Sequence, residues 1–307
     1  VASGTTPYTS GFRKAFRITN GNQTGGAGAG DAIVLGYKLE AQDLANSGWN
    51  YVSSSSYITL SFWVKSSVAQ NFYGRLTTTD GTSQNYPFET GSLTADTWTK
   101  ITKTIPGNSN LQFDNNADKG IDIEWMMFRG TNFTDSGVTL NAWAAYASGT
   151  RTPDNTTTWY TTDDATFEIT GVQLEVGSVA TDFEHRSFAQ ELALCQRYFE
   201  QYNFTSFSFE AIMPSHNTNT SGGTLGVFPW RAEKRATPTV TLSADSTFRL
   251  NGGGPSDVQA TSMSISRTGK YTTKIDCNAS RSQTQGLAGY ISRQDTETTF
   301  IQISAEL

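Results

Sequence analysis

The amino-acid sequence predicts an all-β protein: an antiparallel jelly-roll sandwich, then one linking helix, then a smaller distal β-domain. Three observations predict this fold class. Apolar and polar residues alternate in many short segments, which is typical of strands with one buried face. The 307 residues include 28 Gly and only 16% charged residues, as expected for strands joined by frequent turns. Finally, a single stretch near residue 190 has apolar residues at helical spacing.

The first predicted domain spans residues 1–185 and contains the clearest alternation in the chain. The side chains expected on the buried face of residues 58–65 are Ile58, Leu60, Phe62 and Val64. Their burial contributes roughly 6–12 kcal/mol, at about 1.5–3 kcal/mol each, while Trp63 points to the opposite face. Residues 121–127 repeat the pattern, and residues 98–105 form a third strand that ends at a Pro-Gly pair. We therefore expect two antiparallel sheets packed face to face.

The last strand of this domain changes phase at Gly171. Phe167 and Ile169 share one face, whereas Val172 and Leu174 are out of step with them. A glycine at such a break predicts a β-bulge, because the extra residue re-aims the strand and glycine accepts the unusual backbone conformation.

Residues 186–203 are predicted to form the linking helix. Ser187 followed by Gln190 is a capping-box pattern at its start. Its apolar residues recur at helical spacing and form one stripe: Phe188, Leu192, Cys195, Phe199 and Tyr202. Cys195 on this stripe is interpreted as a small buried hydrophobe. Since one helix cannot bury its own stripe, we expect the stripe to pack on either domain or on its copies in an oligomer.

The distal domain, residues 204–307, returns to strand patterns separated by turns. Its predicted strands lie at 224–228, 239–242, 248–250, 263–265, 271–275 and 300–303. The segments are short and half apolar, so this domain is also expected to be built from antiparallel sheets.

Several motifs resemble those of surface fibre and adhesin-like proteins of tailed bacteriophages. They are Leu-Ser-Phe-Trp-Val-Lys-Ser-Ser at 60–67, Ile-Pro-Gly at 105–107, Gly-Val-Gln-Leu-Glu at 171–175, Leu-Cys-Gln-Arg-Tyr at 194–198 and Arg-Ala-Thr-Pro-Thr-Val at 235–240. Residues 10–185 resemble the jelly roll of carbohydrate-binding modules found in phage fibres. The resemblance implies a non-catalytic domain, either glycan-binding or purely structural, in a homotrimer on the virion surface.

The chain departs from that pattern at two places. Asp182 stands where relatives often carry Pro, and Trp-Arg-Ala-Glu-Lys at 230–234 is an unusual lead into the Arg-Ala motif. Both departures concern the geometry of the tip and the specificity for a ligand rather than the fold.

Composition argues against several other classes of protein. The net charge is -6, and no run of 18 apolar residues occurs, so we expect neither nucleic-acid binding nor membrane insertion. Two cysteines, Cys195 and Cys277, are too few for a disulfide framework. With only two histidines, the chain has few residues from which a zinc site or a Ser-His-Asp triad could be built. Accordingly, no catalytic residue and no cofactor are predicted.

A glycan depolymerase is the enzymatic alternative, and it would need two carboxylates facing each other across a cleft. The nearest candidates are Asp122, Glu124, Asp163, Asp164 and Glu168. Alternating acidic residues on an outward strand face are typically solvated, so catalysis is not predicted. Asp163 and Asp164 could instead supply oxygen ligands to Ca²⁺, although their spacing matches no calcium-loop motif.

Aromatic residues in polar loops and at strand margins are the predicted ligand-binding residues. They are Trp49, Tyr51, Trp63, Trp143, Trp159, Tyr160 and Trp230. Sugar rings present C–H faces that pack on flat aromatic side chains, while neighbouring polar groups bind the hydroxyls. Large aromatics also fill the ends of sandwiches and subunit contacts, so that alternative stays open for each of them.

The sequence thus predicts a non-enzymatic virion surface protein of the tail-fibre type. It is expected to bind a host cell-surface glycan, to contact other virion proteins, and to form a homotrimer. Millimolar binding by each copy would become strong attachment through avidity. Two further alternatives are a capsid decoration or tail-assembly component without glycan binding, and an accessory module of a secreted bacterial hydrolase.

Overall fold

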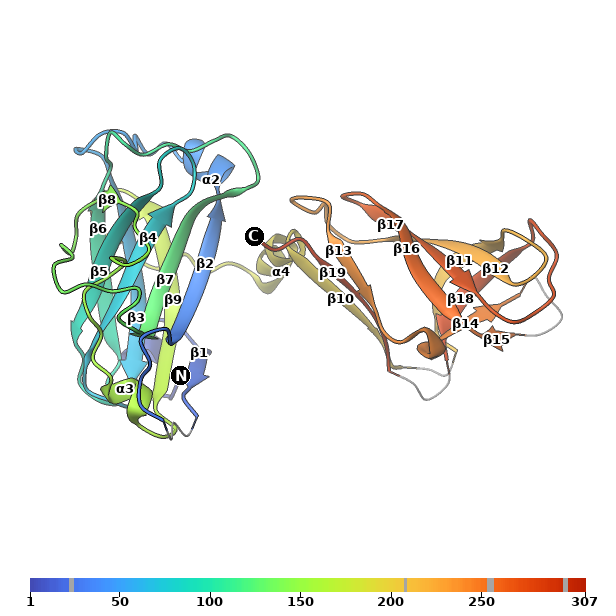
Figure 1. Ribbon diagram of the computed structural model, residues 1–307, viewed down its shortest axis with the longest axis horizontal. Helices are drawn as coiled ribbons and strands as arrows, with labels where there is room; N and C mark the ends of the chain where they lie inside the picture. Colours follow the sequence, from blue (N-terminus) through green and yellow to red (C-terminus); the bar gives the residue numbers. More distant parts are fainter. Residues whose placement is uncertain (22–24, 207–208, 253–256, 295–297) are drawn as a thin grey trace. The chain divides into compact units, whose positions relative to one another are not determined.

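The computed structural model describes residues 1–307 except 22–24, 207–208, 253–256 and 295–297. The chain divides into two compact units, Val1–His185 and Arg186–Leu307 (Figure 1). Both units are built mainly from antiparallel strands.

Unit 1 is a sandwich of two antiparallel sheets. The first sheet has the strand order β1 (Phe16–Thr19), β9 (Thr166–Val176), β3 (Tyr57–Ser66), β6 (Thr99–Pro106). The second has the order β2 (Ala32–Glu40), β7 (Lys119–Arg129), β4 (Asn71–Thr78), β5 (Gln84–Ser92), β8 (Ala144–Ala145). Three short helices accompany them: α1 (Thr6–Thr9), α2 (Ala41–Ala45) and α3 (Thr158–Thr161).

The strands of unit 1 pair in a nested order. β1 pairs with β9, β2 with β7, β3 with β6 and β4 with β5, all antiparallel. The two-residue strand β8 is added to the outer edge of β5. Eight strands nested in this way between two sheets form a jelly roll, so the predicted fold class is confirmed.

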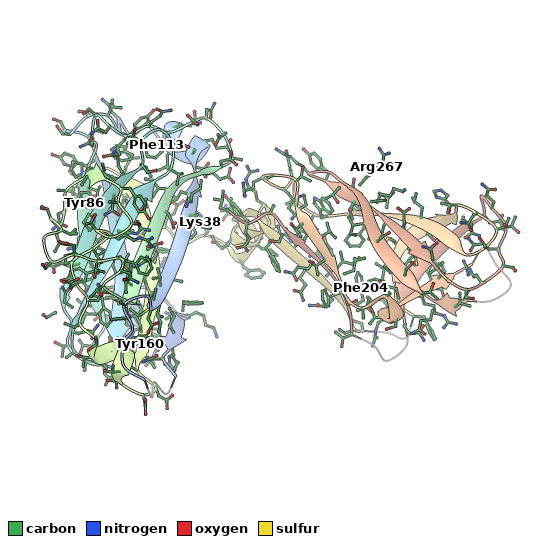
Figure 2. The ribbon with its side chains drawn as sticks, viewed as in Figure 1. Lys38, Tyr86, Phe113, Tyr160, Phe204 and Arg267 are labelled. Atoms are coloured by element: carbon green, nitrogen blue, oxygen red, sulfur yellow. The ribbon has the colours of Figure 1, made fainter. Side chains whose placement is uncertain are left out.

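The core of unit 1 lies between its two sheets and follows the predicted alternation. Leu60, Phe62 and Val64 of β3 have no exposed surface. Across the core, Trp125 of β7 meets Phe62 edge-on, with ring centroids 5.6 Å apart. Figure 2 shows the side chains that fill this layer, among them Tyr86.

The predicted bulge in the last strand of unit 1 is confirmed. The β3–β9 register shifts between Ser61 and Trp63, which face Gln173 and Thr170 respectively. Gly171 lies in the extra step with φ +61°. A β-carbon there would approach the ring of Phe12 to 2.5 Å, so both the backbone conformation and the close packing require glycine.

Unit 2 begins with helix α4 (Phe188–Gln196), which is shorter than predicted. The capping box is confirmed, because the Gln190 N–H donates to Ser187 Oγ while the Ser187 N–H donates to Gln190 Oε1. However, Phe199 and Tyr202 do not belong to the helix. They lie in strand β10 (Phe199–Phe204), which pairs with β19 (Thr299–Ser304). Backbone pairing with a distant strand overrides the local helical spacing in this segment.

Helix α4 leaves its apolar side chains exposed within unit 2. No residue of α4 is buried, and the Phe188 side chain is among the most exposed in the chain. The interpretation of Cys195 as a buried hydrophobe is therefore wrong, since this thiol is exposed. Among the helices of the described segments, none is long and apolar enough to cross a membrane.

Unit 2 contains two antiparallel sheets. The smaller has the order β10, β19, β13 (Thr239–Leu242). The larger has the order β15 (Val258–Gln259), β14 (Phe248–Asn251), β18 (Ala288–Arg293), β11 (Ala211–Asn217), β12 (Gly223–Pro229), β17 (Thr272–Asn278), β16 (Ser262–Thr268), and the 3-10 turn η1 (Asp245–Thr247) precedes β14. Ile275, Ile291, Ile301 and Phe248 are fully buried in the core of this unit.

A buried ion pair explains the unusual segment 230–234. The Lys234 side chain is completely buried, and its Nζ lies 2.6 Å from Glu200 Oε1. Glu200 also accepts hydrogen bonds from the Tyr202 hydroxyl and from the backbone N–H groups of Arg231 and Ala232. Lys234 donates a second hydrogen bond to the carbonyl of Gln196, the last residue of α4. The segment therefore fastens the end of the helix to the distal sheets.

Candidate functional site

Four of the seven aromatic residues predicted to bind a ligand are buried. Trp159 has no exposed surface, and Trp49, Tyr160 and Trp230 are at most 8% exposed. Buried rings cannot present a face to a sugar, so the structure assigns these four to packing. Tyr51 is partly buried and meets the Phe113 ring edge-on at 4.9 Å, which is also a packing contact.

The two remaining candidates, Trp63 and Trp143, are partly buried and line separate hollows on the two sheets of unit 1. Trp143 belongs to the hollow beside β5. Trp63 lies on the outer face of β3, opposite the core residues, as predicted.

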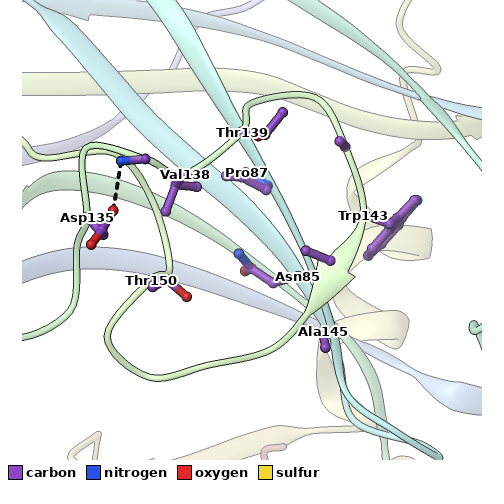
Figure 3. Close-up of a pocket in the computed structure, with 11 residues that line it drawn as sticks. Asn85, Pro87, Asp135, Val138, Thr139, Trp143, Ala145 and Thr150 are labelled. Carbon is purple, nitrogen blue, oxygen red and sulfur yellow. Dashed lines mark hydrogen bonds between the residues drawn. The ribbon is translucent and has the colours of Figure 1, made fainter.

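The hollow at Trp143, here called the loop pocket, has a volume of about 460 Å³. It lies between β5 and the covering loop, residues 130–157 (Figure 3). Its lining is Asn85, Pro87, Asp135, Gly137, Val138, Thr139, Ala142, Trp143, Ala144, Ala145 and Thr150. The volume falls within the range of about 300–1,000 Å³ that is typical of small-ligand sites. Its wall combines apolar groups with the polar side chains of Asn85, Asp135, Thr139 and Thr150.

Backbone hydrogen bonds attach the covering loop to the edge of β5 on both sides of the pocket. The Asn141 N–H donates to the Pro87 carbonyl at 2.8 Å, and the Tyr146 N–H donates to the Ser83 carbonyl at 2.9 Å. Between these points, β8 pairs with Gln84 and Asn85. The loop thus supplies an extra strand to the sheet, and its backbone position is fixed by the sheet itself.

Within the pocket, individual side chains are also held in place. The Asn85 amide donates to the Arg151 carbonyl at 2.9 Å, and Asp135 Oδ1 accepts from the Gly137 N–H at 2.7 Å (Figure 3). The Trp143 indole N–H donates to the Pro106 carbonyl at 2.7 Å, and its ring lies 5.2 Å from that of Tyr86. These contacts fix the wall of the pocket within the folded unit.

Beneath the covering loop, guanidinium groups and aromatic rings alternate in what we call the arginine ladder. Its members, in order, are Arg129, Phe133, Arg151, Tyr146 and Arg75. The Cζ atom of Arg151 lies 4.7 Å from the Phe133 ring centroid and 5.8 Å from that of Tyr146. Arg129 lies over Phe133 at 5.6 Å, and Arg75 over Tyr146 at 5.5 Å. Four such contacts contribute roughly 2–4 kcal/mol, at about 0.5–1 kcal/mol each.

Glu124 is the carboxylate that balances the arginine ladder. Its Oε2 accepts from Arg75 Nε at 2.7 Å and from Arg129 at 3.0 Å, and all three side chains are at most 14% exposed. Burial opposes ionisation and would raise the pKa of Glu124. The hydrogen bond from Arg75 and the positive charges of Arg75, Arg129 and Arg151 outweigh it, so the pKa is lowered. Glu124 therefore stays ionised and anchors the ladder to the sheet.

This arrangement corrects the expected role of the acidic residues. Asp122 and Glu124 do point away from the core, but the covering loop shields Glu124 from solvent. Glu168 is likewise engaged, by Arg17 and Lys65. Carboxylates held in ion pairs are not presented across a cleft, as hydrolysis of a glycosidic bond would require. Each hollow has one acidic side chain in its lining, Asp135 in the loop pocket and Asp182 at Trp63.

The calcium hypothesis gains no support from the described part of the chain. No group of three or more His, Cys, Asp or Glu residues there is close enough to hold a metal ion. Asp163 and Asp164 are exposed in the turn after α3.

The covering loop and its ladder were not predicted from the sequence. The ladder residues of the loop lie 13 and 5 positions apart, at Phe133, Tyr146 and Arg151, so no strand or helix period relates them. Composition gave no signal either, because residues 130–157 contain one arginine and three aromatic residues, which is no enrichment over the chain's 12% aromatic content.

Comparisons with known proteins give no family. No family model matches the chain, and no curated protein matches it. Among solved structures, the chain is similar to one in the cryo-EM structure of the T=1 Penaeus vannamei nodavirus, with 13% identity. The alignment covers 96% of this chain and 98% of that chain, but the TM-score is 0.18. At that TM-score the similarity supports no argument about fold or function.

Proposed function

We propose that this chain is a non-enzymatic surface protein of a tailed-bacteriophage virion that binds host cell-surface glycans through unit 1. The observation that carries the proposal is the loop pocket, which is walled by Trp143 together with amide, hydroxyl and carboxylate groups. Such a mixture suits a sugar, because the ring packs on apolar groups while its hydroxyls need donors and acceptors. The phage-fibre motifs supply the virion setting.

The fixed position of the covering loop supports this function. A pocket that is formed before the ligand arrives avoids the entropic cost of ordering a loop on binding. The β5 edge bonds and the arginine ladder both hold the loop in the folded unit. A single pocket of this kind is expected to bind weakly, in the millimolar range as predicted from the sequence, and several copies on one particle would convert this into firm attachment.

A binding experiment on arrays of bacterial surface polysaccharides tests the proposal. The wild-type chain is expected to bind at least one polysaccharide, and Thr139→Arg is expected to weaken that binding by filling the pocket from an exposed position. Ser55→Arg is the matched control, because Ser55 is exposed and lines neither hollow. Equal binding by all three proteins would contradict the assignment of the site.

The second candidate function is a structural role in the virion without glycan binding, as a capsid decoration or tail-assembly component. The burial of Trp49, Trp159, Tyr160 and Trp230 favours it, because most of the aromatic residues serve the cores. A wild-type chain that binds no polysaccharide on the array would support this candidate over the first.

We also propose that the chain forms a homotrimer through α4. The exposed side chains of Phe188, Leu192 and Leu194 supply an apolar surface within unit 2 that association would cover. Light scattering should then give a mass of about three times the chain's 33.4 kDa. Replacing Phe188 and Leu192 by Ser should lower that mass to the monomer value, and a monomeric wild type would reject the proposal.

A further inference from the structure

A second hollow lies on the outer face of the other sheet of unit 1. This hollow, called the Trp63 groove, has a volume of about 460 Å³. Its floor comes from β3, β6 and the bulge of β9, and its walls come from the segments 9–12 and 181–185. The lining is Thr9, Ser10, Gly11, Phe12, Ser61, Trp63, Lys100, Gly171, Thr181, Asp182, Phe183 and His185. It shares no residue with the loop pocket.

Trp63 differs from four of the other tryptophans in its indole N–H group, whereas the indole N–H of the buried core residue Trp125 likewise has no acceptor. The indole N–H groups of Trp49, Trp143, Trp159 and Trp230 each donate to a backbone carbonyl. The indole N–H of Trp63 has no acceptor among the described residues, and its ring is partly exposed. A tryptophan at the floor of a hollow with an unused donor suits contact with a polar ligand.

Lys100 is placed beside that ring by strand pairing. Trp63 and Lys100 are directly opposite each other in the β3–β6 register, so both side chains lie on the outer face. Lys100 is exposed, and although its charge helps to lower the pKa of Glu175, no hydrogen bond or salt bridge to a described residue occupies its ammonium group. Its ammonium group can therefore donate to a ligand that rests against the Trp63 ring.

The wall of the groove is fastened to the sheet by hydrogen bonds. The Thr181 N–H and hydroxyl both donate to Glu175, at 2.9 and 2.7 Å, and the Glu184 N–H donates to Gln173 Oε1 at 2.9 Å. Asp182 lies between these two attachment points, and its exposed carboxylate lines the groove. The segment that carries Asp182 is consequently held across the outer face of β9.

Three aromatic rings close the end of the groove at the bulge. Phe12, Phe183 and His185 pack with ring centroids 4.9–5.2 Å apart. The His185 ring also contacts the Ser10 carbonyl, with Nε2 at 3.1 Å. The missing side chain of Gly171 leaves room for Phe12 in this cluster. The aromatic cluster joins the N-terminal segment to the segment that follows β9, so both walls are positioned together.

The charges in the groove favour an uncharged ligand. One cation, Lys100, and one carboxylate, Asp182, line it, and Glu175, which accepts hydrogen bonds from Thr181 and Gln173, adds a second negative charge that interacts with Lys100. An acidic sugar would be attracted by Lys100 but repelled by Asp182. A neutral sugar can use both, since a hydroxyl group accepts from an ammonium and donates to a carboxylate.

We propose that the Trp63 groove is a second saccharide-binding site, and that it takes a neutral hexose ring packed against Trp63 with its hydroxyls on Lys100 and Asp182. The proposal shares the ligand class of the proposed function but rests on its own residues. The groove and the loop pocket lie on opposite outer faces of the sandwich, so one chain would hold two separate glycan segments. Linking two weak sites in one chain raises avidity without any new contact.

Fluorine NMR on the full chain labelled with 5-fluorotryptophan tests the proposal. The seven tryptophan signals are assigned by single Trp→Phe variants, and the probes are neutral oligosaccharides of glucose, galactose, mannose and N-acetylglucosamine, with oligogalacturonate as the acidic comparison. We expect at least one neutral probe to shift the Trp63 signal. Asp182→Asn, a change at an exposed position, should weaken that binding at least about fivefold. Asp135→Asn, in the loop pocket, should leave it unchanged.

The outcomes separate this proposal from the proposed function. A shift of the Trp143 signal alone, with no neutral probe moving Trp63, overturns the second site and leaves the loop pocket standing. A shift of Trp63 by oligogalacturonate but by no neutral probe overturns the choice of an uncharged ligand. A Trp63 response that is unaffected by Asp182→Asn overturns the assigned role of that carboxylate.

Discussion

Replacing Glu124 by Gln removes the carboxylate to which the arginine ladder is anchored. In the wild type, Glu124 Oε2 receives Arg75 at 2.7 Å and Arg129 at 3.0 Å, with exposed side-chain fractions of 14%, 5% and 6% for the three residues. In the Glu124→Gln variant, the guanidinium groups of Arg75, Arg129 and Arg151 would remain close together without a countercharge. We expect unit 1 to become markedly less stable.

The magnitude follows from the burial of this cluster. Breaking a buried ion pair by removing one partner costs about 3–5 kcal/mol, because the remaining charge loses its compensation. Since Glu124 retains some exposure and Gln can still accept a hydrogen bond, the lower end, about 3 kcal/mol, is the appropriate figure. With a urea dependence of about 2 kcal/mol per M, that loss lowers the unfolding midpoint by roughly 1.5 M.

Tryptophan fluorescence is a suitable assay, because six of the seven tryptophans lie in unit 1 and only Trp230 lies in unit 2. Asp122→Asn is the matched control. Asp122 lies on the same strand and face but pairs with Lys119, whose side chain is 31% exposed, so its loss should cost at most about 1 kcal/mol. A Glu124→Gln midpoint within about 0.3 M of the wild-type value would refute the role of Glu124 as the anchor.

The same substitution has a signature in the dependence of stability on pH. The folded-state pKa of Glu124 is lowered below its ordinary value of about 4.3. Glu124 thus contributes its full stabilisation at pH values above its ordinary pKa. That contribution is lost as the pH falls through the lowered pKa of the folded state. Wild-type unit 1 should therefore lose stability below about pH 4 more steeply than Glu124→Gln. Parallel pH profiles would contradict the lowered pKa.

Three other substitutions test separate parts of the structure. Gly171→Ala should destabilise unit 1 by about 1–2 kcal/mol or more, since φ is +61° and the new β-carbon would meet the Phe12 ring; an unchanged melting temperature would argue against the bulge. Lys234→Met should cost about 3 kcal/mol in unit 2 by leaving Glu200 buried without its partner, measured as a lower calorimetric transition for that unit; no shift would contradict the buried pair. Tyr146→Leu should reduce the free energy of polysaccharide binding at the loop pocket more than the free energy of unfolding, because it removes the ring between Arg75 and Arg151. Unchanged binding would show that the ladder does not hold the loop.

Much of the fold could be predicted from the sequence, because each strand carries its own period. The alternation in β3 and β7 identified which side chains face the core, and the phase change at Gly171 located the bulge. The nested strand pairing is different, since it depends on contacts between distant segments that no local pattern records. The periodicity indicated two packed sheets, in a sandwich or a jelly roll, and the motifs that resemble phage fibres indicated the jelly roll in particular.

The error in the linking helix has a physical reason. Phe199 and Tyr202 continue the helical spacing of Leu192 and Cys195, but the segment that contains them is also compatible with a strand, in which Glu200 and Tyr202 share one face. The chain adopts the strand because β19 supplies its backbone partners and Lys234 receives Glu200. Neither partner is near in sequence, so local spacing alone favoured the wrong element.

The site was predicted only in part for a similar reason. An aromatic residue in a polar segment is equally compatible with a ligand site and with a core position, and the difference is set by what packs over it. Trp159 and Trp230 are covered by distant segments, whereas Trp63 and Trp143 line hollows. The covering loop that forms one hollow and shields Glu124 has no periodic pattern, so it could not be read from the sequence.

Binding of saccharide at the two outer-face hollows of unit 1 is the central claim, and one variant tests it most directly. The doubly blocked chain Asp182→Arg/Thr139→Arg fills both hollows from exposed positions, and its unfolding midpoint can be checked by fluorescence. On an array of bacterial surface polysaccharides it is predicted to bind nothing that the wild type binds. Retention of wild-type binding by this folded variant would contradict the account.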